Sequence, residues 1–262
     1  MSSSPEMAAM LNFVHVGVSR ARQYFGGTSA TSAEHTPEYA AVLERIRAAR
    51  HMVDLGCGAN PHPRATIGVD AFREPIHRIL GKGPTLDAAT FRQRGIPFVQ
   101  ADLSALPFRD KEFDFAYSHH VFEHLPSPKQ ACAEMCRVAE AGVIFTPSVF
   151  SEVAFGRPYH LWFVMARGSR LVFLGKTARE NRPFGPHPEL DPRTGEYRDA
   201  PDTNPFEMLL NDADWYRGRE KMPRLTRLLR RYWYSHSWVT EVCFPWTGSF
   251  ECTVIHEDGR IE

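Results

Sequence analysis

The sequence lacks an uninterrupted apolar run close to the ~20 residues that a membrane-spanning helix needs. Residues 1–27 also lack the positively charged start and long apolar stretch that are typical of a secretion signal. We therefore expect a cytoplasmic protein with no membrane span.

The cysteines lack the spacing of a metal or disulfide framework. There are five of them, an odd number, and none forms a CxxC pair. Cys132 and Cys136 lie one turn apart on a predicted helix, where small buried hydrophobic residues are the simpler explanation. Most of the twelve histidines stand alone. We expect no metal.

An excess of charge is also missing, because 31 basic residues balance 31 acidic ones. The overall field therefore gives no reason to expect nucleic acid or an anionic membrane as a partner. Internal repeats and low-complexity tracts are absent from the sequence, and nothing in it predicts the oligomeric state.

The chain is long enough to bury a sizeable core. Its 262 residues, 43% of them hydrophobic, fit one α/β domain with additions. We expect N-terminal helices in 1–49, a cofactor-binding core in 50–150, a hairpin insert and proline-rich loop in 151–205, and a C-terminal helix with a final strand pair in 206–262.

The segment His51-Met52-Val53-Asp54-Leu55-Gly56-Cys57-Gly58 combines a buried strand with a glycine turn. Gly56 and Gly58 allow backbone angles that a side chain forbids, and they leave room for a ligand close to the main chain. In open parallel sheets, such a turn after the first strand is where nucleotide-like ligands bind.

This segment resembles the first motif of the class I S-adenosylmethionine-dependent methyltransferases. Three later segments match the family's order: TIGVDAF, FVQADLSALPF and FDFAYSHHVFEHLPSP. The last resembles the S-x-x-V-x-E-H fourth motif of a bacterial subgroup that includes quinone-biosynthesis enzymes and many small-molecule methyltransferases. The resemblance covers about residues 50–150. It implies a Rossmann-like α/β fold with a doubly wound sheet of seven mostly parallel strands, and S-adenosylmethionine as the cofactor.

The pattern of the remaining chain predicts further elements. Helices are expected over 8–25, 37–49, 127–138 and 206–234, and strands over 98–103, 113–118 and 141–147. The short link between Gly58 and Asp70 holds two prolines, so its crossover helix should be reduced to a turn. Residues 160–166 and 170–175 predict a hairpin after strand five, and a second hairpin around Thr247-Gly248 supplies the last two strands. The proline-rich stretch 181–205 is either a substrate lid or a passive loop.

Cofactor-binding residues follow from these positions. Asp54 is placed to reach the ammonium of the methionine moiety, and Asp70 can accept both ribose hydroxyls. Asp102 can accept the adenine amino group beside the Leu103 amide, while Ser118 begins the loop beneath the sulfonium. Asp70 and Asp102 lie at strand ends, where either residue could instead be a turn former. The full set is Asp54, Gly56, Cys57, Gly58, Asp70, Ala71, Ala101, Asp102, Leu103 and Ser118.

A nicotinamide-dependent dehydrogenase is the main rival within this fold class. Its fingerprint requires GxGxxG at the start of a full helix, with an acid ~20 residues later. Here the third glycine is absent, Pro61 follows closely, and Asp70 comes too early. The dehydrogenase interpretation is disfavoured.

Acceptor chemistry is expected at the mouth of strand four. One of His119 and His120 should face the pocket, and we take His119 as the general base, or as a residue that only shapes the cavity. Substrate contacts are expected from His120, Phe150, His160 and Trp162, although core packing explains the aromatic residues equally well. Glu123 and His124 match the family's E-H pair and are expected to brace the loop and the following helix.

The sequence therefore predicts methyl transfer to a small molecule, such as a natural product or a saccharide precursor. An N/D-P-P-Y/F motif, typical of enzymes that methylate nucleic-acid amino groups, is absent from the sequence. Two alternatives remain: a scaffold that binds S-adenosylmethionine without transferring methyl groups, and a methyltransferase acting on protein or nucleic acid.

Overall fold

The computed structural model describes residues 37–58, 61–71, 95–155, 157, 160–177, 189–190, 197–198, 228 and 237–262. The predicted helix over 8–25 lies outside these residues, and so does nearly all of the predicted helix over 206–234. The proline-rich stretch 181–205 is described only at β8 (Glu189–Leu190) and β9 (Tyr197–Arg198), an antiparallel pair. Its role as a lid or passive loop stays open.

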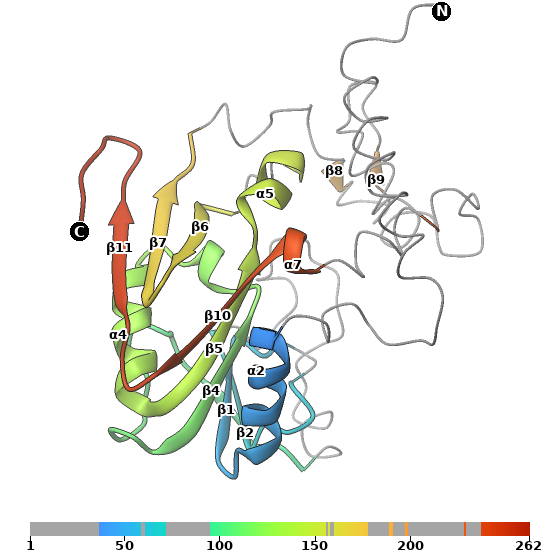
Figure 1. Cartoon of the computed structure of the whole chain (residues 1–262), viewed down its shortest axis with the longest axis vertical. Coiled ribbons are helices and arrows are strands. Elements are labelled where there is room, and N and C mark those ends of the chain that lie inside the picture. The colour runs from blue at the N-terminus through green and yellow to red at the C-terminus, as the bar shows by residue number, and fades with distance from the viewer. Residues whose placement is uncertain are drawn as a thin grey trace, which may run out of the picture.

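The fold is mixed α/β, with a mostly parallel central sheet (Figure 1). Six strands among the described residues form this sheet in the order β10-β5-β4-β1-β2-β3. Their bounds are β1 Met52–Leu55, β2 Ile67–Asp70, β3 Phe98–Gln100, β4 Phe113–His119, β5 Ala139–Pro147 and β10 Glu241–Thr247. β1 to β5 are mutually parallel, and β10 runs antiparallel to β5. This is the Rossmann-like arrangement that the sequence predicts, although the described strands do not supply a seventh.

The final two strands differ from the prediction. The sequence predicts a hairpin within the central sheet, but only β10 joins it. β11 (Glu251–Ile255) instead pairs in parallel with β7 (Arg170–Gly175), which is antiparallel to β6 (Trp162–Arg167). The strand pair predicted after strand five is therefore present, but it belongs to a second, three-stranded sheet that β11 completes. Figure 1 shows β11, β7 and β6 together beside the central sheet.

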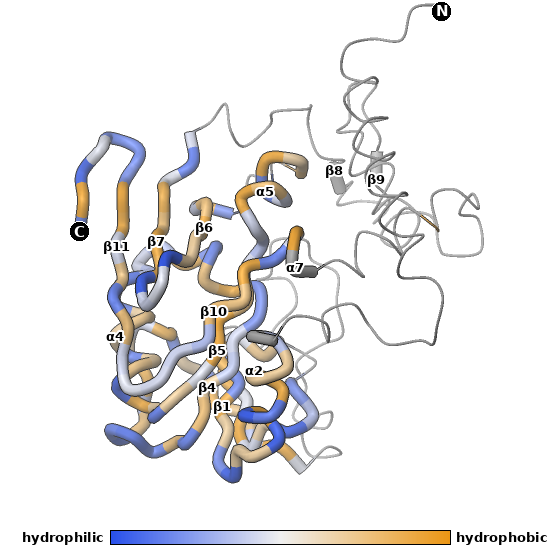
Figure 2. The backbone as a smooth tube through the Cα atoms, viewed as in Figure 1, coloured by the Kyte–Doolittle hydropathy of each residue, from blue (hydrophilic) through white to orange (hydrophobic). Residues whose placement is uncertain are grey.

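Helices cover both faces of the central sheet because successive side chains of a strand point to opposite faces. On one face, Val42 and Ile46 of α2 (Pro37–Ala48) pack with Met52 of β1. On the other, Met135 of α4 (Pro128–Val138) packs in the same core cluster as Val53. The strands of the central sheet are largely hydrophobic, while the loops at the bottom of the view in Figure 2 are largely hydrophilic.

Most predicted boundaries agree with the structure. α2, β4 and α4 lie where expected, with Pro128 in the first turn of α4, where its missing amide hydrogen is not needed. β3 ends three residues early because a turn begins at residue 103, and the described residues between β1 and β2 form turns without a helix. The short helices α5 (Val149–Phe155), α7 (Ser237–Thr240) and η3 (Phe122–His124) were not predicted. Among the described residues, the helices are too short or too polar to cross a membrane.

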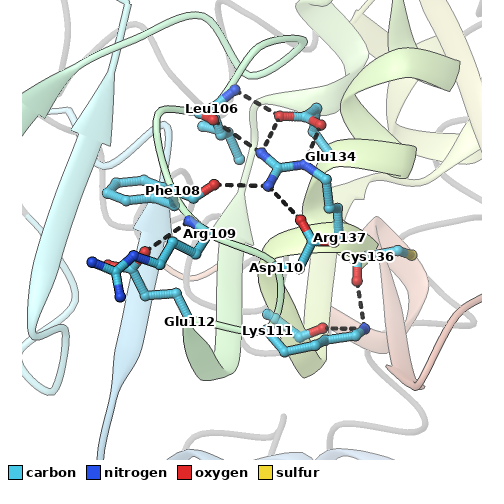
Figure 3. Close-up of polar contacts among 10 residues, drawn as sticks. Leu106, Phe108, Arg109, Asp110, Lys111, Glu112, Glu134, Cys136 and Arg137 are labelled. Atoms are coloured by element: carbon cyan, nitrogen blue, oxygen red, sulfur yellow. Dashed lines mark hydrogen bonds and ion pairs between the residues drawn. The ribbon is translucent and has the colours of Figure 1, made fainter.

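Arg137 at the end of α4 ties this helix to the loop between β3 and β4 (Figure 3). Its guanidinium donates to the carbonyl oxygens of Leu106 (3.0 Å) and Phe108 (2.7 Å), and it forms a forked ion pair with Glu134. Glu134 in turn accepts from the Leu106 amide at 2.7 Å. Hydrogen bonds to Arg137 and Glu134 therefore fix the loop after β3 against α4.

Candidate active site

The site lies at the carboxyl edge of the central sheet, where β1, β2, β3, β4 and β5 all end. β10 begins at the same edge, because Glu241 pairs with Pro147, the last residue of β5. In open α/β sheets, ligands bind at this edge. Every cofactor-binding residue predicted from the sequence lies on one of these strand ends or directly after it.

The glycine turn is held by hydrogen bonds to β2. The amides of Gly56 and Cys57 donate to the Val69 carbonyl at 2.7 and 3.0 Å. The amide of Gly58 donates to the Asp70 carboxylate at 2.9 Å, so Asp70 organises the turn as well as the tip of its own strand. Gly56 and Gly58 have φ angles of +79° and +55°, in the region where a side chain is strained.

The space above Gly56 is not the ligand space that the sequence suggested. A Cβ added to Gly56 would lie 2.2 Å from a methyl group of Val121, in the loop after β4. Gly56 is therefore required for the close approach of Val121.

Asp54 is almost completely buried, and its carboxylate accepts from the His62 amide at 2.7 Å. Burial raises the pKa of Asp54 to about 6, although the His62 amide and the nearby His119 oppose this shift. An ammonium group beside Asp54 would restore the ionised form. This carboxyl therefore fits the role predicted for it toward the methionine end of the cofactor.

The residues predicted to contact adenine lie at the third strand tip, where each already has a structural role. Asp102 uses one oxygen to accept from both the amide and the hydroxyl of Ser104 at 2.8 Å, which is the turn-former role that the sequence left open. Leu103 is buried, and the Ala101 amide donates to the Asp70 carbonyl at 3.1 Å. Ala71 is exposed, and its carbonyl accepts from Gln100.

Ser118 is placed differently from the prediction. Its side chain is fully buried, and its hydroxyl donates to the Leu55 carbonyl at 2.9 Å. It therefore joins β4 to the end of β1, and the structure gives its hydroxyl no opening toward a ligand.

His119 and His120 converge on one carboxylate, rather than facing the pocket and the protein body separately. Their Nε2 atoms lie 3.5 and 2.8 Å from the same oxygen of Glu241, and their ring centroids are 4.3 Å apart. The backbone explains this, because His120 has a φ of +56°, which turns the chain back after the strand. Burial lowers the pKa of His120, against the pull of Glu241.

Glu241 is one of three site residues that the sequence did not predict. Burial alone would raise the pKa of Glu241, but the interactions with His119 and His120 outweigh this effect and hold the pKa at about 2. Glu241 is far along the chain from the histidines, and the only available signal was a polar residue near the start of a predicted strand. His62 and Tyr117 were also missed. Their rings lie 4.7 Å apart beside Asp54, and Tyr117 stacks on His119.

The remaining predicted substrate residues have different surroundings. Phe150 is 38% exposed on α5. His160 is buried, and its Nδ1 lies 2.5 Å from Glu152, so it does not line an open pocket as predicted. Trp162 belongs to the hydrophobic core, with its indole nitrogen donating to the Leu125 carbonyl at 2.7 Å. The structure thus accounts for His160 and Trp162 as interior residues.

A buried polar cluster lies behind these residues. Glu152 binds His160 on one oxygen and the buried Lys176 ammonium on the other, at 2.8 Å. Burial opposes ionisation of Glu152, but the two partners outweigh it and hold its pKa at about 2. Burial lowers the pKa of His160 to about 3 and raises the pKa of Glu123 well above its usual range.

The donor set fits S-adenosylmethionine. A buried carboxyl that favours a cationic partner, a glycine turn and two strand-tip acids lie at one edge of the sheet. These groups match the charges and hydroxyls of the cofactor.

Comparison with known proteins agrees with this geometry. Residues 53–146, which hold β1 to β5 apart from their outermost residues, match a family model described as a methyltransferase domain. This segment is therefore similar to a methyltransferase domain, which supports S-adenosylmethionine as the cofactor.

Known proteins are similar to part of the chain. Demethylmenaquinone methyltransferase of Renibacterium salmoninarum is 33% identical over 104 residues, which are 40% of this chain and 42% of that protein. An uncharacterised chloroplastic methyltransferase of Arabidopsis thaliana is 32% identical over 133 residues, covering 46% and 36%. The YcgJ protein of Bacillus subtilis, a solved structure, is 21% identical with a TM-score of 0.35, covering 47% and 61%. The chain spans less than half the length of these two curated relatives.

Proposed function

We propose that this protein transfers a methyl group from S-adenosylmethionine to a small-molecule acceptor. The observation that carries the proposal is the arrangement of Asp54, the Gly56–Gly58 turn and Asp70 beside the histidine pair at one sheet edge. One relative is named for a small-molecule acceptor, demethylmenaquinone, which supports this acceptor class. A single domain and a cytoplasmic location stay predictions.

S-adenosylmethionine supplies an electrophilic methyl group on its sulfonium when bound. We assign Asp54 to the ammonium of its methionine end, and Asp70 to the ribose hydroxyls. His119 is the residue that we assign to the acceptor's proton, because its side chain is 43% exposed at the mouth of β4. Glu241, ionised at neutral pH, would stabilise the imidazolium that forms. Positioning of the acceptor supplies much of the remaining catalysis.

The cofactor assignment is tested by calorimetric titration of S-adenosylmethionine into wild type, Asp70→Ala and His119→Ala. We expect Asp70→Ala to weaken binding at least about tenfold, because the turn loses its acceptor and the ribose its carboxylate. His119→Ala should bind almost normally and lose turnover instead. Asp258→Ala, in the exposed turn after β11, is the control. Equal affinity of wild type and Asp70→Ala would contradict the ribose assignment.

The acceptor is tested by transfer of a labelled methyl group into fractions of cell extract. Label in a small-molecule fraction supports the proposal, and label in protein or nucleic acid favours the alternative acceptors. Tight cofactor binding without any labelled product favours the scaffold.

A further inference from the structure

Glu123 is a buried carboxyl whose oxygens lack hydrogen-bond partners among the described residues. Its side chain has no exposed surface. A buried polar group left in this state is costly, and it calls for a proton, a water or an ion that completes it.

Two imidazole nitrogens approach this carboxylate at distances too long for good hydrogen bonds. Nδ1 of His120 and Nε2 of His124 lie 3.6 and 3.8 Å from the same Glu123 oxygen. One donor atom each from Glu123, His124 and His160 lie within 4.8 Å of one another. Ligand atoms around a tetrahedral zinc ion are about 3.4 Å apart, so small side-chain shifts would bring these three onto one ion.

His160 is already oriented as metal-binding histidines are. Its Nδ1 faces Glu152 at 2.5 Å, and Glu152 is neutralised by Lys176. A histidine that donates from Nδ1 to a carboxylate carries its lone pair on Nε2, which is the outer-partner arrangement found behind metal ligands. The rings of His160 and His124 meet edge to face, with centroids 4.5 Å apart.

We propose that Glu123, His124 and His160 form a binding site for a first-row divalent cation of the zinc type. Two imidazoles and a carboxylate suit Zn²⁺ or Co²⁺ better than Mg²⁺. Water or His120 would fill the fourth position, and His120 is itself hydrogen-bonded to Glu241. The ion would link η3 to the chain that enters β6, directly behind the histidine pair. This site goes beyond the proposed methyl transfer and does not depend on it.

The test uses the full chain without a polyhistidine tag, stripped with a chelator. Zn²⁺ is titrated by calorimetry, Co²⁺ by visible absorption, and Mg²⁺ as a comparison. We expect about one equivalent of Zn²⁺ and a higher melting temperature, with negligible Mg²⁺ binding. Glu123→Gln and His124→Ala should weaken Zn²⁺ binding about 100-fold or more, and Glu152→Gln about tenfold.

The variants separate this site from its rivals. Glu123→Gln has the shape of a protonated Glu123, so a wild type that takes up no Zn²⁺ and melts like Glu123→Gln would overturn the proposal. Zn²⁺ binding that is lost in Glu241→Gln but kept in Glu123→Gln would also overturn it, because the ion would then lie on His119 and His120. His51→Ala, an exposed histidine at the opposite end of β1, should bind as wild type does. S-adenosylmethionine titrated into the same samples reports the proposed function separately.

Discussion

Asp54 is a buried acid at the centre of the predicted cofactor site, and its effect on stability and its proposed contact with the cofactor have opposite pH dependence. Its pKa in the folded protein is about 6, above the 3.8 of an unperturbed aspartate. Its contribution to stability is therefore fully present below pH 3.8 and is lost as the pH rises through 6. The ammonium of the cofactor, in contrast, requires the ionised carboxylate.

We predict that S-adenosylmethionine binds about tenfold more tightly at pH 7 than at pH 5, because Asp54 ionises between these values. In Asp54→Asn this dependence should be largely lost, while the ligand-free variant should be more stable than wild type above pH 6, by about 2 kcal/mol. Calorimetry and urea unfolding at both pH values measure the two effects. Parallel pH profiles in wild type and variant would count against the ammonium contact.

Gly56 combines a strained backbone with a tight contact, and the two effects can be separated. Gly56→Ala should lower the free energy of unfolding by more than about 2 kcal/mol, because the added carbon meets both a φ of +79° and the Val121 methyl groups. Gly168→Ala, with a φ of +58° and open space around it, should lose only about 1 kcal/mol.

Urea unfolding of Gly56→Ala combined with Val121→Ala completes this comparison. The double variant should lose less than the sum of the single changes, since Val121→Ala removes the two methyl groups that meet the added carbon at 2.2 and 2.7 Å. If the two losses in unfolding free energy were strictly additive, the contact with Val121 would not be the reason that position 56 requires glycine.

At the scale of elements, Arg137 holds α4 against the loop that carries the third strand tip (Figure 3). We predict that Arg137→Met lowers the free energy of unfolding by about 2 kcal/mol, because two carbonyls and Glu134 lose a charged donor. Arg170→Met removes an ion pair with Glu251 whose side chains are 51% and 64% exposed, and it should lose less than about 1 kcal/mol. Equal losses in urea unfolding would contradict the bracing role of Arg137.

At the scale of the whole molecule, the two sheets share one hydrophobic core. Val254 of β11 and Phe173 of β7 belong to the same buried cluster as Ile144 of the central sheet. α4 packs between β5 and β11. The second sheet is therefore part of the core and not a separate appendage.

We predict that Val254→Ala lowers the free energy of unfolding by about 1–2 kcal/mol and does so for both sheets together. Circular dichroism and hydrogen exchange at the amides of β1 should then report the same loss, as in a two-state transition. Protection of β1 that stays at the wild-type level would show that the second sheet unfolds independently.

The sequence by itself determined the order of α2, α4 and the strands β1 to β5, and the position of the glycine turn. These features depend on local signals: the alternation of apolar residues in β4, Pro128 at the start of α4, and glycines where φ is positive. The strand-tip acids Asp70 and Asp102 could be predicted for the same reason, because parallel strands bring their carboxyl ends to one edge.

Only the tertiary structure decided which segments meet across long distances. The sheet that β11 joins, the convergence of Glu241 on the histidine pair, and the assembly of Glu123 with His124 and His160 all depend on packing between remote parts of the chain. Hydrophobic periodicity reports whether a residue is buried, but it does not report against which partner. For that reason Ser118, His160 and Trp162 could be placed in the site from sequence, while the packing of the core gave their side chains interior partners.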